Sequence, residues 1–304
     1  MKKLILATLV LTSQFCFGQG IAVLSNEAIP LPASLGASYA PLISPTGDYI
    51  LVTNNGMKGL KMYDFATQQV TTVCDDAGAG FEAKISNDGR TIVYRSREYK
   101  DKLRYTTLKS IDLQNGKTTT IVKKSRNLNG IAAVNGTVYG VNSGKLKTKR
   151  ISGDKVTAPA IASIIDGQLY VTYKGDTKQI SPAGTSVSYI WQSISPKGDK
   201  VLYTVMERAK TYICNLDGSN PVLLGELSAP TWMGNDWVVG MLDQDNGEVV
   251  TSSSIVAVKA DGTSRTILTD KSEICMYPTA SLDAKKVVYN TASGKVFLMN
   301  VKTK

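Results

Sequence analysis

The chain of 304 residues contains no histidine. This absence excludes the Ser-His-Asp triad, the Cys-His dyad, histidine general bases and every zinc or iron site that needs an imidazole ligand. No Gly-x-Ser-x-Gly motif occurs, which removes the serine-hydrolase elbow as well. An enzyme of this sequence would depend on carboxylate, lysine or tyrosine chemistry. The sequence predicts no catalytic residue, no metal site and no cofactor.

Cysteine is scarce, with Cys16 near the amino terminus and Cys74, Cys214 and Cys275 far apart along the rest of the chain. The three later cysteines form an odd and sparse set, which is not a disulfide framework even in an oxidising compartment. We therefore expect buried free thiols at the three later positions. One disulfide between two of them stays open as an alternative.

Long apolar runs are also missing, and the longest one lies at the amino terminus. Lys2 and Lys3 precede apolar residues 4–11, and small or polar residues follow as far as Gly18. This order of basic, apolar and small residues predicts a secretory signal peptide over residues 1–18. The run is too short to anchor the chain in a membrane, because a spanning helix needs about 20 apolar residues.

The mature protein that follows is expected to be periplasmic or secreted, and not an integral membrane protein. Cys16 raises a lipoprotein alternative, but the bulky Phe15 before it is unfavourable for lipoprotein processing. No linker or low-complexity tract interrupts the rest of the chain. We expect a single domain over residues 19–304.

A short repeat is the strongest positive signal in the chain. Each copy is an apolar strand, a turn of the Ser-Pro/Asn-x-Gly type and a second apolar strand. Asp-Gly and Asn-Gly sequences, which suit tight hairpin turns, often join a further pair of strands behind it. The copies of this cassette are ISPTGDYILVT (43–53), ISNDGRTIVYR (85–95), ISPKGDKVLYT (194–204) and the degraded ASLDAKKVVYN (280–290).

Four antiparallel strands in about 40 residues are the repeat of a β-propeller blade. The fold class is therefore all-β, a single β-propeller of four-stranded antiparallel blades. Turn signals predict six blades. A further cassette at 160–173 would make seven, but spacing favours 168–174 as a third strand instead of a second. We also expect the strand within 21–32 to complete the last blade beside 295–304 and so close the ring.

The cassettes, with Ile-Ser-Pro-x-Gly-Asp at 194–199 as the clearest copy, resemble the TolB-type, WD-repeat-like propeller repeat of bacterial envelope proteins. The resemblance covers nearly all of residues 19–304. It implies a platform for protein or glycan binding more than a particular activity. The chain departs from TolB itself in leaving no room for TolB's separate amino-terminal domain, and the histidine–metal chemistry of propeller lyases is absent.

Positive charge is concentrated in one stretch of the chain. Residues 95–155 hold fifteen Lys and Arg against four acids, a surplus of +11, while the whole chain carries +10. Such a field would attract an anionic glycan or an acidic envelope protein, and export argues against nucleic acid. Solvated strand faces and protected sheet edges are the alternative explanation. The predicted basic patch consists of Lys123, Lys124, Arg126, Lys145, Lys147, Lys149 and Arg150.

Aromatic residues recur at the start of several innermost strands, where the central channel should open. Aromatic rings suit sugar or peptide binding, although packing between blades would also explain them. The predicted funnel consists of Tyr39, Phe81, Trp191 and Tyr277, with Glu82, Lys84 and Gln192 between them.

The acidic segment 242–248 resembles the opening of a calcium loop, but Ser254 stands where the distal glutamate would be needed. We expect a hairpin there.

The sequence thus predicts an exported, monomeric, non-enzymatic platform that binds an envelope protein or an anionic glycan. The alternative is a carbohydrate-active hydrolase or lyase that uses carboxylate, tyrosine or lysine groups in the channel.

Overall fold

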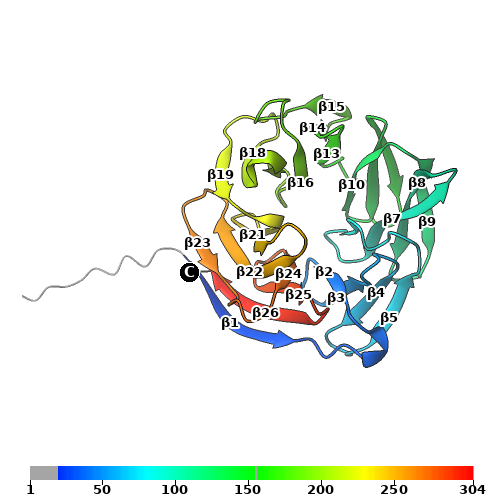
Figure 1. Ribbon diagram of the computed structural model, residues 1–304. Helices are drawn as coiled ribbons and strands as arrows, with labels where there is room; N and C mark the ends of the chain where they lie inside the picture. The colour runs from blue at the N-terminus through cyan, green and yellow to red at the C-terminus, as the bar shows by residue number, and fades with distance from the viewer. Residues whose placement is uncertain (1–19, 155, 304) are drawn as a thin grey trace, which may run out of the picture.

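Seven small antiparallel sheets surround a common axis in the computed structural model of the chain (Figure 1). The structure describes residues 20–154 and 156–303. The predicted signal peptide, residues 1–18, lies outside the described residues. No helix in the described ranges has the length and apolar character that crossing a membrane requires.

We number the sheets as blades 1 to 7, each running from its innermost to its outermost strand in chain order. Blade 1 is β2 (Tyr39–Ile43), β3 (Tyr49–Thr53), β4 (Leu60–Asp64) and β5 (Val70–Cys74). Blade 2 is β6 (Lys84–Ile85), β7 (Thr91–Lys100), β8 (Leu103–Asp112) and β9 (Thr118–Ser125). Blade 3 is β10 (Leu128–Val134), β11 (Thr137–Asn142) and β12 (Lys145–Arg150).

The remaining blades follow the same antiparallel order. Blade 4 is β13 (Ile161–Ile165), β14 (Gln168–Tyr173) and β15 (Asp176–Gln179). Blade 5 is β16 (Tyr189–Ile194), β17 (Lys200–Val205), β18 (Lys210–Asn215) and β19 (Val222–Gly225). Blade 6 is β20 (Ser228–Met233), β21 (Trp237–Asp245), β22 (Val250–Lys259) and β23 (Arg265–Ile267). Blade 7 is β24 (Cys275–Ala280), β25 (Lys286–Thr291), β26 (Val296–Thr303) and, as its outermost strand, β1 (Ile21–Ala28). Two single turns of 3-10 helix, Ala33–Leu35 and Met206–Arg208, lie between strands.

The serine of each cassette closes the turn between the first two strands of its blade. Ser44, Ser86, Ser195 and Ser281 each accept, at Oγ, backbone N–H groups from the far side of the turn at 2.9–3.3 Å. All four serines are buried. A short side chain that replaces missing backbone partners explains why Ser recurs at this position.

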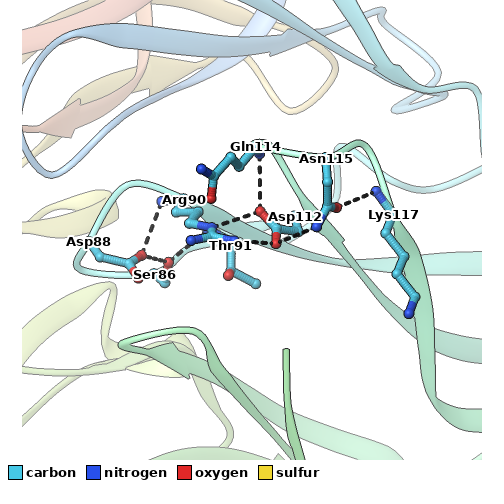
Figure 2. A network of polar contacts seen from close by, with 8 residues as sticks. All are labelled: Ser86, Asp88, Arg90, Thr91, Asp112, Gln114, Asn115 and Lys117. Carbon is cyan, nitrogen blue, oxygen red and sulfur yellow. Dashed lines mark hydrogen bonds and ion pairs between the residues drawn. The ribbon is translucent and has the colours of Figure 1, made fainter. Parts of the chain in front are cut away.

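Blade 2 extends this turn into a wider network, which Figure 2 shows from close by. Arg90 donates two hydrogen bonds to the buried carboxylate of Asp112, from Nε to Oδ1 at 2.8 Å and from Nη2 to Oδ2 at 2.7 Å. The backbone N–H of Gln114 and the side-chain amide of Asn115 donate to the same carboxylate. Because the guanidinium stabilises the charged form, the pKa of Asp112 lies below its usual range. The network joins two turns at one end of the blade.

The core is divided among the junctions between blades. The described residues contain seven clusters of buried apolar side chains, one at each junction between neighbouring blades. Because successive side chains of a second strand point to opposite faces of its blade, a second strand can contribute apolar residues to both neighbouring junctions. In β7, Ile92 and Tyr94 pack toward blade 1, while Val93 packs toward blade 3. Face-to-face burial of this kind is what holds successive blades together.

The prediction of six blades is wrong, because the structure has seven. The segment Gln168–Tyr173 is the second strand of blade 4, not a third strand, and it follows a two-residue turn at Asp166 and Gly167. Blades 3 and 4 have three strands each among the described residues, while the other five have four. Because these two blades lack an outer strand among the described residues, the repeat is shorter in this region. The shorter repeat is why the spacing wrongly favoured 168–174 as a third strand.

The prediction of ring closure is confirmed. β1 pairs antiparallel with β26 from Ile21, opposite Thr303, to Ala28, opposite Phe297. Figure 1 shows this seam as the blue strand lying beside the red one. The two ends of the described chain therefore share one sheet, and the ring closes through backbone hydrogen bonds.

Candidate functional site

The strained innermost-strand residues, the exposed aromatic side chains and the two longest hairpins lie on one face of the ring. Strands alternate in direction within each blade, so the starts of the innermost strands share a face with the hairpin that joins the second and third strands. We call this the entry face. The Ser-containing turns lie on the opposite face.

A shared backbone distortion marks the innermost strands near the entry face. Five residues at the same position of five blades have left-handed backbone torsions, with φ between 45° and 54°. The ladder register shifts at four of these positions, as at a β-bulge. Non-glycine residues rarely adopt such torsions, and strain of this kind concentrates at functional sites. The five residues are Ala40, Glu82, Trp191, Ala229 and Tyr277.

The four predicted funnel aromatics fall into two registers. Trp191 and Tyr277 occupy the bulge position itself, with 42% and 38% of their surfaces exposed. Phe81 and Tyr39 lie one residue earlier. Phe81 is 41% exposed beneath the Arg97 guanidinium, which stacks 4.1 Å from its ring centroid, whereas Tyr39 is half-buried. Three aromatic rings are thus accessible around the entry face.

The polar members of the predicted funnel meet in a cavity of about 200 Å³. Glu82, Lys84 and Gln192 line it, together with the inner strands β10 and β13. These two strands contribute the small residues Gly130, Ala132, Ala133 and Ala162, and Ala160 directly before β13 adds another. The four aromatics do not line this cavity. The predicted funnel therefore separates into a polar pocket and an aromatic rim.

Arg95 on β7 also lines the pocket and was not among the site residues predicted from the sequence. Its side chain is almost fully buried and pairs with the Glu82 carboxylate, while Nη2 donates to the backbone oxygen of Asn129 at 3.4 Å. Thr53, Thr204 and Asn290 occupy the same position in other cassettes. The signal available in the sequence was this single charged residue at a position that is otherwise uncharged.

Lys84 has a different environment from Arg95. Its side chain is exposed and lines the pocket, and desolvation there lowers the pKa of its ammonium group; nearby Glu82 opposes the effect and Arg95 adds to it. Among the described residues no hydrogen bond or ion pair is formed by this ammonium. The pocket therefore holds one carboxylate and two cations.

Two long hairpins rise from the entry face beside the pocket and rim. β7 and β8 pair over ten residues each, and β21 and β22 pair from Trp237 to Asp245 on the first strand. Their ends expose apolar side chains, with Tyr99 73% and Val249 61% accessible. The segment 242–248 is part of the second hairpin, as expected, with Asn246 N–H donating to the Val249 carbonyl oxygen at 3.3 Å. These exposed apolar ends were not predicted from the sequence.

The predicted basic patch lies on the outer strands of two neighbouring blades. Lys123 and Lys124 are on β9, and Arg126 follows that strand directly, while the other four residues are on β12. All seven side chains are exposed. Lys124 pairs with Glu98 at 2.8 Å. The structure thus brings these residues together at one side of the ring, with Lys145, Lys147 and Lys149 on a single face of β12.

The three cysteines of the described chain are free, which agrees with the expectation of unpaired thiols. Cys214 and Cys275 are buried, and Cys74 is partly buried. Burial raises the pKa of Cys214 to about 12. The thiols pack beneath tyrosines of the second strands and contribute no reactive group to the pocket.

The fold is a seven-bladed β-propeller that is similar to the propellers of TolB proteins. TolB from Acinetobacter baumannii superposes with a TM-score of 0.52 at 13% identity, covering 78% of this chain and 55% of that one. A protein provisionally named TolB from Agrobacterium tumefaciens gives 0.52 at 15% identity, with 88% and 91% covered. An oligogalacturonate lyase in complex with manganese gives 0.50 at 13% identity, with 88% and 78% covered. Comparison with protein families and with curated proteins gives no match. These identities establish the fold alone.

Proposed function

We propose that this propeller is a non-enzymatic binding platform of the bacterial cell envelope, and that its partner binds at the entry face. The observation that carries the proposal is the combination of a polar pocket with an exposed aromatic rim at the inner ends of the blades. Tyr, Trp and Arg are the residues that most often dominate binding energy at protein interfaces. Trp191, Tyr277 and the stacked pair of Phe81 with Arg97 supply all three types here.

The strained backbone supports a role for the rim in binding. Trp191 and Tyr277 hold left-handed torsions that glycine would adopt without strain. At the same position in other blades, Ala40 and Ala229 carry no large side chain. Large exposed rings at two strained positions, where alanine suffices elsewhere, favour a functional explanation over packing.

The charge inventory of the pocket favours binding over the alternative of a carbohydrate-active enzyme. A glycosidase needs two carboxyl groups about 5–10 Å apart. Glu82 is the single carboxylate among the residues that line the pocket, and Arg95 already neutralises it. An enzyme at this site would have to use Lys84 as its base.

The partner and location follow from charge and from the amino-terminal sequence. The basic patch and the surplus of pocket cations favour an acidic protein or an anionic glycan, and we propose that the protein is monomeric. The signal peptide at 1–18 favours export to the periplasm or beyond, with cleavage after Gly18. Mass spectrometry of the exported protein tests that cleavage, because a chain that retains residues 1–18 would contradict it. The TolB likeness adds a precedent at the level of fold.

Capture from envelope extract tests the platform. Residues 19–304 would be immobilised as wild type and as the double variant Trp191→Ala/Tyr277→Ala, and bound material compared at low and high salt. We expect the double variant to capture at least about tenfold less of a partner than the wild type, since each large aromatic anchor contributes more than 1 kcal/mol. Leu282→Ala is the control, because Leu282 is also exposed but lies on the opposite face. Equal capture by all three proteins would contradict the proposal.

A further inference from the structure

We propose that the pocket at the inner ends of blades 2 to 5 binds a small anionic group, a carboxylate or a phosphate, with Lys84 as its principal contact. This inference rests on the proposed binding function of the entry face and names the chemistry of the group that enters it. It does not depend on the aromatic rim.

The unmatched charge of Lys84 is the first argument. The ammonium group of Lys84 lines the cavity, forms no hydrogen bond or ion pair among the described residues and has a second cation nearby, so its field favours an anion. Glu82 is the nearest carboxylate in the pocket, but Arg95 engages it. Two cations against one carboxylate leave one positive charge over. An anion of charge −1 would balance the pocket.

The burial of Arg95 is the second argument. Seven equivalent positions on the second strands form a buried layer, and six of them hold Thr, Val, Met or Asn. The Arg95 side chain is buried whereas that of Glu82 is 43% exposed, and such an ion pair contributes little net stability compared with neutral residues of similar volume. The stability of the fold therefore does not explain why an arginine occupies this buried position. It does fix a guanidinium beside the ammonium of Lys84, which is the type of group that recognises carboxylates and phosphates.

The walls of the pocket provide neutral hydrogen-bonding groups as well. Gln192 contributes an amide from β16. The neighbouring Ser193 hydroxyl is buried and has no hydrogen-bond partner among the described residues. Small residues on β10 and β13 leave the volume of about 200 Å³ between these groups. A cavity of this volume, lined by two cations, an amide and a hydroxyl, suits a small anion such as a sugar acid.

Lysine NMR measures this binding directly. Residues 19–304 would be labelled with ¹³C at lysine Cε, and the Lys84 resonance identified by its absence from Lys84→Gln. The probes are sodium acetate, sodium succinate and inorganic phosphate, with acetamide as the neutral counterpart of acetate. We expect saturable shifts of the Lys84 resonance with at least one anion and none with acetamide. Succinate against phosphate decides between the two chemistries. Shifts no larger than those of exposed lysines such as Lys178 would overturn the inference.

Two substitutions predict opposite effects, so unfolding cannot mimic both. Glu82→Gln removes the carboxylate that competes for Arg95 and is expected to tighten anion binding several-fold. Lys84→Gln is expected to weaken it by about tenfold, as for loss of one charge-assisted hydrogen bond. Lys178→Gln is the matched control on the exposed strand β15. For Lys84→Gln, which lacks the Lys84 resonance, isothermal titration calorimetry and the resonances of the remaining lysines replace the missing signal. Equal affinities for wild type and both pocket variants would also overturn the inference.

Failure of this inference is separable from failure of the platform. If envelope capture depends on Trp191 and Tyr277 but no anion shifts the Lys84 resonance, the proposed anion site is contradicted and the proposed binding platform is supported. If Lys84 responds to anions while capture is independent of the rim, the anion site stands and the platform is wrong.

Discussion

The hydroxyl of Tyr289 lies 2.9 Å from Nδ2 and 3.0 Å from Oδ1 of Asn26, across the seam where the first described strand meets the last blade. The two residues are 263 positions apart in the chain. Tyr289 is buried, and burial raises the pKa of its hydroxyl, which therefore stays protonated and able to donate. This contact fixes the side chains of β1 on the ring that its backbone closes.

Removal of the closing strand should open the ring. Deletion of residues 19–34 eliminates the ladder between β1 and β26 and exposes a long strand edge. We expect the melting temperature to fall by more than about 10 °C, at roughly 2–4 °C for each kcal/mol lost. Circular dichroism on heating measures this. Asn26→Ala is the milder companion and should cost about 1 kcal/mol. An unchanged melting curve for the deletion would contradict closure by β1.

The ion pair of Arg90 with Asp112 should make stability depend on acid pH. The pKa of Asp112 is lowered in the folded protein, chiefly by its hydrogen bonds with Arg90, so its stabilisation is complete above about pH 3.9 and is lost as the pH falls through the lowered pKa. Arg90→Met leaves a buried carboxylate without its charge partner and should lower the free energy of unfolding by about 1–3 kcal/mol at pH 7.

Urea unfolding of wild type and Arg90→Met at several pH values provides the measurement. The difference between the two proteins should shrink as the pH falls toward the lowered pKa of Asp112 and vanish below it, because Asp112 is then protonated in both. Lys285→Met, at an exposed ion pair with Asp283 separated by 3.5 Å, serves as the control and should change little. A difference that is constant from pH 7 to pH 2.5 would argue against the ion pair as its origin.

The strained bulges predict that glycine stabilises the ring at one position. Ala229 has a φ of 45°, and a left-handed alanine costs about 1–2 kcal/mol, while glycine adds about 0.5–1 kcal/mol of backbone entropy to the unfolded chain. We expect Ala229→Gly to gain up to about 1 kcal/mol in urea unfolding. Ala133→Gly is the control in β10 at an ordinary strand torsion, and it should lose stability. Equal losses from both substitutions would show that the bulge is unstrained.

The three thiols should resist alkylation and oxidation in the folded protein. Burial raises the pKa of each of the three, and that of Cys214 to about 12, so the reactive thiolate is nearly absent at neutral pH. We expect Ellman's reagent to react slowly with native protein between pH 7 and 9 and rapidly with all three thiols in guanidinium. Fewer than three reactive thiols in the denatured, unreduced protein would indicate a disulfide.

The blade was predictable because its determinants are local. Ser86, Gly89 and Arg90 act within one turn, and Ile92, Val93 and Tyr94 alternate between two junctions in adjacent positions. Such short-range patterns repeat with the blade and survive substitution at other positions. The strand pairs and the outermost position of β1 were both anticipated on this basis.

The number of blades was not predictable in the same way. The two-residue turn at Asp166 and Gly167 replaces the longer Ser-containing turn, and blade 3 has no fourth strand after β12 among the residues that the structure describes. Both changes shift the spacing of the repeat and leave the strand composition similar. The seventh core cluster, which lies between blades 3 and 4 around Tyr139 and Ile161, appears only once the sheets are placed beside one another.

What the sequence by itself determined is the architecture of the propeller, the closing strand and the polar and aromatic residues at the inner ends of the blades. Only the tertiary structure separated Glu82, Lys84 and Gln192 from the aromatic rim and placed Arg95 among them. The physical reason is the difference between local and convergent geometry. Hydrogen-bonded turns and alternating strands are fixed by neighbours in the chain, whereas a pocket is formed by the inner ends of several blades, whose relative positions depend on the packing of the whole ring.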